Sequence, residues 1–200
     1  MPRHPDRFYP VVDTVAWVER LSRLGVATVQ LRAKDRSHDD AVALVRAALA
    51  KTDGTDTALV VNDYWRAAID AGARHIHLGQ EDLGDADVPA IRHAGLTLGL
   101  STHDDEELET ALRHDPDYVA LGPIYPTTLK VMRFGPQGLD RIGQWKRRLG
   151  TIPLVAIGGI TLERAPAVFA AGADSIAVVS DVTQAREPEA RVREWLALAR

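Results

Sequence analysis

The chain has 200 residues, of which 46% are hydrophobic and 26% are charged. This balance predicts one globular domain spanning residues 1–200 and excludes disordered, collagen-like and coiled-coil classes. The net charge of -4 disfavours binding to nucleic acid. No apolar run reaches about 18 residues, so we expect no membrane partner. Because the chain has no cysteine and its opening residues contain no apolar leader, we expect a cytoplasmic protein.

Short apolar runs alternate along the chain with segments of helical spacing. Strands are expected at residues 8–12, 26–31, 58–61, 75–78, 97–100, 118–121, 154–157 and 175–179. Alternation of this kind predicts parallel strands joined by crossover helices. Eight such units in 200 residues favour an α/β fold, a small single-domain (β/α)8 TIM barrel.

Glycines mark the ends of several expected helices. Gly25, Gly72, Gly95 and Gly172 each follow a helical pattern and precede a strand, where a left-handed cap is easiest for glycine. The longest irregular stretch, residues 122–138, exceeds the usual length of a strand-to-helix loop. It is therefore a candidate active-site loop.

The second expected strand ends in alternating polar residues. Gln30, Arg32 and Lys34 fall on one face at the strand period of two. A polar strand face is commonly exposed to solvent in an antiparallel sheet, but helices cover the outside of a closed parallel barrel. We therefore expect these three side chains to point into the mouth of the barrel, where active sites of this fold lie.

Acidic residues follow the third and fourth expected strands. Asn62 and Asp63 end the third, and Asp82 follows the fourth. Taken singly, each motif also fits a turn or a solvated loop. On one rim with Arg32 and Lys34, however, the two carboxylates would suit Mg²⁺ and a polyphosphate, because hard oxygen ligands hold the metal and cations bind the remaining phosphate charge.

Hydroxyl groups, a lysine and glycines follow the remaining strands. Ser101 follows the fifth strand, although Ser101 or Thr102 could instead cap the acidic helix that begins nearby. Two threonines and Lys130 lie on the long loop after the sixth. Gly159 and Ser180 follow the seventh and eighth strands, where barrels commonly bind phosphate through backbone N–H groups.

His75 and His77 raise a rival hypothesis, because His-x-His on a barrel strand can bind zinc in a hydrolase. Both residues open the fourth strand instead of closing it. We therefore place both nearer the opposite rim and expect them to serve packing.

Six motifs in register resemble those of the thiamine phosphate synthase family over nearly the whole chain. They are QLRAK at 30–34, VND at 61–63, HLGQEDL at 77–83, GLS at 99–101, the stretch from Gly122-Pro123 to Lys130, and VAIGGI at 155–160. The resemblance implies that 4-amino-2-methyl-5-pyrimidinylmethyl diphosphate and 4-methyl-5-hydroxyethylthiazole phosphate are joined, with Mg²⁺, into thiamine phosphate and pyrophosphate. It also implies that the bond to diphosphate breaks before the thiazole nitrogen attacks.

The resemblance assigns roles to individual residues. The pyrimidine diphosphate would contact Gln30, Leu31, Arg32, Ala33, Lys34, Asn62, Ser101 and Lys130. Arg32, Lys34, Ser101 and Lys130 would be catalytic, and Asp63 and Asp82 would bind Mg²⁺. The thiazole phosphate would contact Thr127, Thr128, Leu129, Gly159, Val179 and Ser180. Leu129 departs from the family, which commonly has a hydroxyl residue there, and we expect Thr128 or a backbone N–H to replace that contact.

Two alternatives share the same barrel. A thiazole-processing isomerase would not need the diphosphate-binding cations or the two magnesium carboxylates. A non-catalytic regulator that binds thiamine phosphate would keep the phosphate site and lose the catalytic charges. The diphosphate-binding cations and the two magnesium carboxylates are all present in this sequence, which favours the synthase. The sequence does not predict the oligomeric state.

Overall fold

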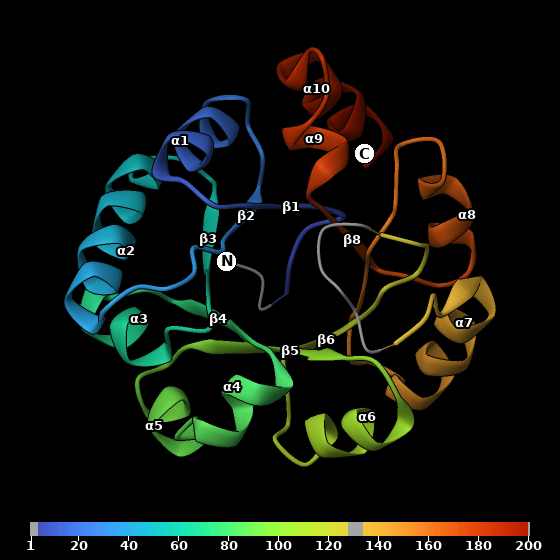
Figure 1. The fold of residues 1–200 in the computed structure, drawn as a ribbon, viewed down its shortest axis with the longest axis horizontal. Helices are drawn as coiled ribbons and strands as arrows, with labels where there is room; N and C mark the ends of the chain where they lie inside the picture. Colours follow the sequence, from blue (N-terminus) through green and yellow to red (C-terminus); the bar gives the residue numbers. More distant parts are fainter. Residues whose placement is uncertain (1–3, 128–133, 200) are drawn as a thin grey trace.

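The structure, a computed structural model, describes residues 4–127 and 134–199. Within these ranges eight strands pair in parallel, each with its neighbour in the sequence, and β8 closes the barrel against β1 (Figure 1). The strands are β1 (Phe8–Val12), β2 (Thr28–Leu31), β3 (Ala58–Asn62), β4 (His75–Leu78), β5 (Thr97–Thr102), β6 (Tyr118–Leu121), β7 (Leu154–Ile157) and β8 (Ser175–Val178). The predicted barrel is confirmed, and each strand lies within two residues of its expected bounds.

Helices form a ring outside the strands (Figure 1). They are α1 (Val15–Arg23), α2 (His38–Thr52), α3 (Trp65–Ala71), α4 (Gln80–Asp85), α5 (Val88–His93), α6 (Asp105–Leu112), α7 (Gly138–Leu149), α8 (Ala165–Ala170), α9 (Ser180–Thr183) and α10 (Pro188–Leu198). In the described ranges, no helix combines the length and apolar character needed to cross a bilayer. The expected glycine caps are confirmed, because Gly25, Gly72, Gly95 and Gly172 all have left-handed backbone, with φ of 80°, 79°, 77° and 111°.

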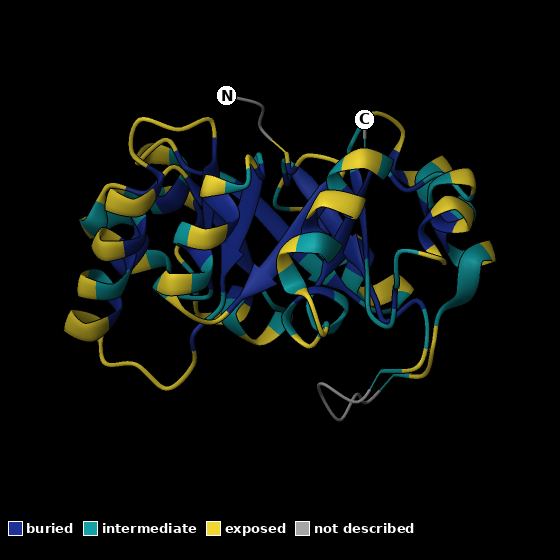
Figure 2. Cartoon of the chain, turned by 90° about the horizontal axis from the view of Figure 1, so that it is seen from above, coloured by how far each residue is buried: buried dark blue, intermediate teal, exposed yellow. Residues whose placement is uncertain are grey.

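Alternation along the strands divides the core into two layers. Outward-facing side chains such as Val29 and Leu31 pack under the helices with Trp145 and Trp195. Inward-facing side chains, among them Tyr118, fill the barrel itself. Figure 2 shows the result, with buried strands at the centre and exposed residues on the outer helices. The barrel interior is thus a packed core, and substrates can reach it only from its ends.

Two aspartates tie the helices to the strands at the amino-terminal end of the barrel. The Asp117 carboxylate accepts the N–H of Leu98 at 2.7 Å and pairs with Arg92 of α5. Asp174, which precedes β8, links a strand to a helix in the same way. Its carboxylate accepts hydrogen bonds from the N–H of Leu154 in β7 and from the ammonium group of Lys146 in α7. This end of the barrel therefore serves stability, which leaves the opposite end for function.

Gly99 makes room for the phenol ring of Tyr118 inside the barrel. A Cβ at Gly99 would lie 2.0 Å from Cζ of Tyr118, which is far inside van der Waals contact. We expect Gly99→Ala to lower the free energy of unfolding by at least about 1–3 kcal/mol, the usual cost of overpacking a core. Gly84→Ala is the control, because a Cβ at Gly84 meets nothing within 4 Å. Urea unfolding of both variants tests this, and equal stabilities would contradict it.

Candidate active site

Two carboxylates meet where β3 and β4 end. Asp63 directly follows β3, and Asp82 lies in the first turn of α4. The two side chains lie close enough to interact, and burial together with the Asp82 carboxylate raises the pKa of Asp63 to about 6. Asp63 has a left-handed backbone, with φ of 65°, a conformation that aspartate and asparagine adopt more readily than most residues. Its N–H donates to the carbonyl of His77 at 3.0 Å, which fixes this turn against β4.

Two cations extend β2 toward the same carboxylates. The N–H of Arg32 donates to the carbonyl of Val12 at 2.7 Å and so continues the pairing of β2 with β1 beyond the strand. Arg32 is half-buried and Lys34 is exposed. The positive charges of both oppose the rise in the pKa of Asp63, so both lie within electrostatic reach of it. The structure therefore brings together the charged residues expected after the second, third and fourth strands.

A buried amide lies beside this charged group. Asn62, the last residue of β3, is only 5% exposed, and no described protein atom accepts a hydrogen bond from its Nδ2. A buried donor without a partner costs about 1–3 kcal/mol, so an acceptor on a bound molecule would be favoured there. Leu31 and Ala33, which belong to the same predicted set, are buried and apolar. They can contact a diphosphate only through their backbone groups.

Ser101 lies at the end of β5 and takes no part in capping a helix. The carboxylate of Asp104 caps α6 by accepting the N–H of Glu107 at 2.8 Å, and Thr102 donates to the carbonyl of Ala120 at 2.9 Å. The interpretation of Ser101 or Thr102 as a helix cap is therefore wrong. Ser101 Oγ instead lies 2.8 Å from Nε2 of His77.

The two histidines of β4 share one face of the strand but lie at different heights along the barrel axis. His75 contacts Thr97 Oγ1 at 2.7 Å at the starts of β4 and β5, which confirms its expected place near the opposite rim. His77 lies two residues, or about 6.6 Å, further along the strand, and its contact with Ser101 shows that its expected place was wrong. A strand of four residues is too short to keep His77 far from the mouth. The described residues contain no group of three or more His, Asp or Glu side chains that could hold a metal ion.

Burial and the charge of Arg32 lower the pKa of His77 to about 4, so its imidazole is neutral at pH 7. Its Nδ1 lies 3.0 Å from the hydroxyl of Tyr118, which in turn lies 3.1 Å from the hydroxyl of Tyr9. Gln30 Nε2 donates to Tyr9 at 2.7 Å. The alternation along β4 places His77 on the inward face, yet the sequence carries no signal of these partners, because Tyr9 and Tyr118 are distant along the chain.

The loops after β6 and β7 fold against each other. The N–H of Ile124 donates to the carbonyl of Ile157 at 2.9 Å, and the N–H of Tyr125 donates to that of Gly158 at 3.0 Å. Gly159 has φ of 65°, and a Cβ there would lie 2.5 Å from the carbonyl oxygen of Pro126. Glycine is therefore required by both backbone conformation and space.

The remaining predicted residues follow at the same end of the barrel. Thr127 is half-buried on the loop after β6. Val179 packs against the inner core, and Ser180 begins α9. The adjacent Asp181 accepts the indole N–H of Trp195 at 2.8 Å, which holds α9 against α10. Thr128, Leu129 and Lys130 lie outside the described residues.

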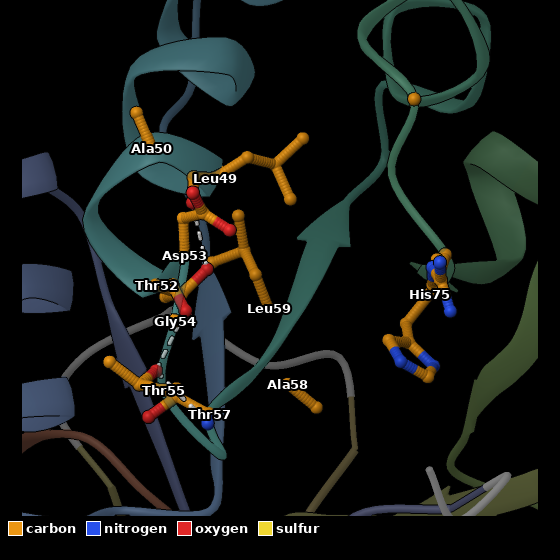
Figure 3. Close-up of a pocket in the computed structure, with 12 residues that line it drawn as sticks. Leu49, Ala50, Thr52, Asp53, Gly54, Thr55, Thr57, Ala58, Leu59 and His75 are labelled. Atoms are coloured by element: carbon orange, nitrogen blue, oxygen red, sulfur yellow. Dashed lines mark hydrogen bonds between the residues drawn. The ribbon is translucent and has the colours of Figure 1, made fainter.

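A recess of about 520 Å³ opens at the other end of the barrel (Figure 3). It lies between the end of α2, the following loop and the start of β4. Its hydroxyls are already paired, since Thr57 donates to the carbonyl of Val26 at 2.7 Å and Thr55 to that of Thr52 at 2.7 Å. None of the predicted site residues that the structure describes lines this recess. The candidate active site is therefore the mouth.

The fold and the mouth together define a (β/α)8-barrel enzyme with cations and carboxylates suited to a phosphorylated substrate. The model of a family described as thiamine monophosphate synthase matches residues 6–182. The chain belongs to this family.

Named relatives agree over nearly the full length of the chain. A thiamine-phosphate synthase of Rhizobium etli is 59% identical over 192 residues, which cover 96% of this chain and 94% of the relative. That of Salmonella typhimurium is 52% identical over 191 residues, covering 96% and 90%. The structure of a thiamine phosphate pyrophosphorylase from Pyrococcus furiosus aligns with a TM-score of 0.83 at 25% identity, covering 98% of this chain and 96% of that one. The chain is thus an enzyme of the transferase class.

Proposed function

We propose that this chain joins 4-amino-2-methyl-5-pyrimidinylmethyl diphosphate to 4-methyl-5-hydroxyethylthiazole phosphate, giving thiamine phosphate and pyrophosphate. The observation that carries the proposal is the meeting of Asp63 and Asp82 after β3 and β4, with Arg32 and Lys34 in electrostatic reach of Asp63. A diphosphate leaving group needs such cations, whereas the isomerase and the regulator do not. Family membership supports the same reaction.

The carboxylate pair fits a divalent cation. Burial and the repulsion between two nearby carboxylates that are both ionised explain the raised pKa of Asp63. Asp63 and Asp82 would hold Mg²⁺, whose preferred ligands are carboxylate oxygens and water. The bound ion would neutralise charge that develops on the departing pyrophosphate.

The chain's own groups would perform the remaining work. Arg32, Lys34 and Lys130 would bind the diphosphate, and preorganised groups of this kind are worth about 3–4 kcal/mol each. Asn62 Nδ2 would donate to the same substrate and so gain the partner that it lacks. If the carbon–oxygen bond breaks before the thiazole nitrogen attacks, the reaction needs neither a protein nucleophile nor a strong general base.

The thiazole phosphate would bind on the other side of the mouth. Gly159, Val179 and Ser180 would contact it at the ends of β7 and β8, together with Thr127 and, on the same loop, Thr128 and Leu129. The fixed contact between the two loops supports this assignment, because it keeps Gly159 in place without a bound ligand. We expect the reaction to take place in the cytoplasm, with no nucleic-acid or membrane partner.

The test is an assay of the purified protein with both substrates, with Mg²⁺ and with a chelator, in which thiamine phosphate is quantified by chromatography. We expect product only when both substrates and Mg²⁺ are present. Conversion of the thiazole phosphate alone would indicate the isomerase. Tight binding of thiamine phosphate without any turnover would indicate the regulator, and an undiminished rate with the chelator would contradict the proposed metal.

A further inference from the structure

A continuous run of hydrogen bonds crosses the barrel interior beneath the proposed pyrimidine diphosphate site. It links Gln30 to Tyr9 at 2.7 Å, Tyr9 to Tyr118 at 3.1 Å, Tyr118 to Nδ1 of His77 at 3.0 Å, and Nε2 of His77 to Ser101 at 2.8 Å. The first four of these side chains are buried. The run therefore crosses the barrel interior and ties together residues of β2, β1, β6, β4 and β5.

The direction of the run follows from counting hydrogens. The amide of Gln30 donates to the oxygen of Tyr9, so the single hydroxyl hydrogen of Tyr9 needs an acceptor elsewhere. Its other partner among the described residues is the oxygen of Tyr118, which must then donate its own hydrogen to Nδ1 of His77. The opposite direction would leave the hydrogen of Tyr9 buried without an acceptor, at a cost of about 1–3 kcal/mol.

The same count of hydrogens determines which atom donates between His77 and Ser101. A neutral imidazole carries one N–H, and Nδ1 of His77 is already occupied as the acceptor from Tyr118. The hydrogen therefore resides on Nε2, which donates to Oγ of Ser101. The hydroxyl hydrogen of Ser101 is then left to point elsewhere.

We propose that this run makes Ser101 a hydrogen-bond donor toward the mouth, with His77 and Tyr118 as positioning residues that fix its orientation. The proposal rests on the proposed function, because the acceptor it serves is the pyrimidine diphosphate, whose oxygens and ring nitrogens all accept hydrogen bonds. A Ser101 hydroxyl that donated to His77 could offer such a substrate only lone pairs.

Packing holds the members of the run in place. The rings of His77 and Tyr118 are stacked with centroids 5.5 Å apart, and Tyr9 meets Tyr118 edge-on at 6.3 Å. Gly99 leaves the space that the phenol of Tyr118 occupies. Gln80 Nε2 donates to the carbonyl of Ser101 at 2.6 Å, so the backbone of Ser101 is held as well. The orientation is thus built into the fold before any substrate binds.

The first test is the tautomer of His77, measured on the full-length protein at pH 7 by ¹⁵N nuclear magnetic resonance of labelled imidazoles. The chain has seven histidines, and the His77→Gln variant assigns the signal. We expect Nε2 to carry the hydrogen and Nδ1 to be unprotonated. The opposite tautomer would overturn the proposal, whether or not any variant is active.

The second test compares Tyr118→Phe with Tyr9→Phe, which remove one hydroxyl each from adjacent positions in the run. Tyr118→Phe deletes the donor to His77, so we expect mixed tautomers and about a tenfold lower kcat/KM for the pyrimidine diphosphate, with the KM for the thiazole phosphate unchanged. Tyr9→Phe keeps that donor and should keep the wild-type tautomer. An unchanged tautomer and unchanged kcat/KM in Tyr118→Phe would overturn the proposal. The predicted tautomer in a protein without synthase activity would instead overturn the proposed function.

Discussion

Replacing Asp63 with asparagine is expected to lower turnover at least about a hundredfold, because the variant loses a carboxylate that would hold Mg²⁺ against the departing pyrophosphate. Asparagine is the informative substitution, since it tolerates the left-handed backbone of residue 63, with φ of 65°, and keeps a similar volume. Steady-state assays across a range of Mg²⁺ concentrations measure the effect. Excess metal should not restore the wild-type rate.

The same variant should be more stable than the wild type when metal is absent. Burial and the Asp82 carboxylate raise the pKa of Asp63 from 3.8 to about 6 in the folded protein. The folded state therefore binds the proton more tightly than the unfolded state, and stability falls as pH rises from about 4 to above 6. Asp63→Asn removes this penalty, which we place at about 1–2 kcal/mol at pH 7.5 after allowing for partial exposure. Denaturation at pH 7.5 and at pH 4 should show the difference only at the higher pH.

Asp115→Asn is the matched control, because Asp115 also has a left-handed backbone, with φ of 49°, but precedes β6 at the amino-terminal end of the barrel. It should keep both wild-type turnover and the wild-type response to Mg²⁺. Near-normal activity in Asp63→Asn, or an equal loss in Asp115→Asn, would show that the Asp63 carboxylate has no special role.

Replacing Arg32 with glutamine is expected to reduce kcat/KM for the pyrimidine diphosphate about a hundredfold or more. The substitution removes a positive charge next to the proposed leaving group. Because Arg32 also opposes the rise in the pKa of Asp63, its loss should raise that pKa further and weaken Mg²⁺ binding near neutral pH. Assays at pH 7 and pH 8.5 separate the two effects, since higher pH should recover metal binding but not the lost cation.

Arg46→Gln serves as the control, because Arg46 lies on α2 outside the barrel, where it donates to the carbonyl of Asp70 at 2.9 Å. We expect it to leave kcat/KM unchanged. An Arg32→Gln variant whose kcat/KM matches that of Arg46→Gln would contradict the proposed contact with the diphosphate.

The barrel was predictable because its strands are short apolar runs and several of its helices end beside a left-handed glycine. β1, β4, β6 and β7 begin and end at the expected residues. β5 extends two residues further than expected, to Thr102, because it continues to pair with β6 through Ser101 and Thr102. Periodicity thus predicts where an element lies, whereas its last residues depend on the neighbouring strand.

The charged part of the site was predictable for a similar reason. Once the strands are parallel, all residues that follow them share one end, so Arg32, Asp63 and Asp82 could be placed together from their positions alone. Which end of the barrel His77 lies nearer was not predictable in this way. A strand of four residues spans most of the distance between the two ends, so a residue near its start can still reach the mouth. The prediction that Ser101 or Thr102 caps α6 was wrong because the side chain of Asp104, three residues after Ser101, accepts the N–H of Glu107 in the first turn of that helix.

The most direct test of the account is a crystal structure of the protein with Mg²⁺ and pyrophosphate. The account predicts an ion about 2.0–2.1 Å from carboxylate oxygens of both Asp63 and Asp82, with Arg32 bound to the pyrophosphate. An ion bound away from these carboxylates, or pyrophosphate in the recess between α2 and β4, would contradict it.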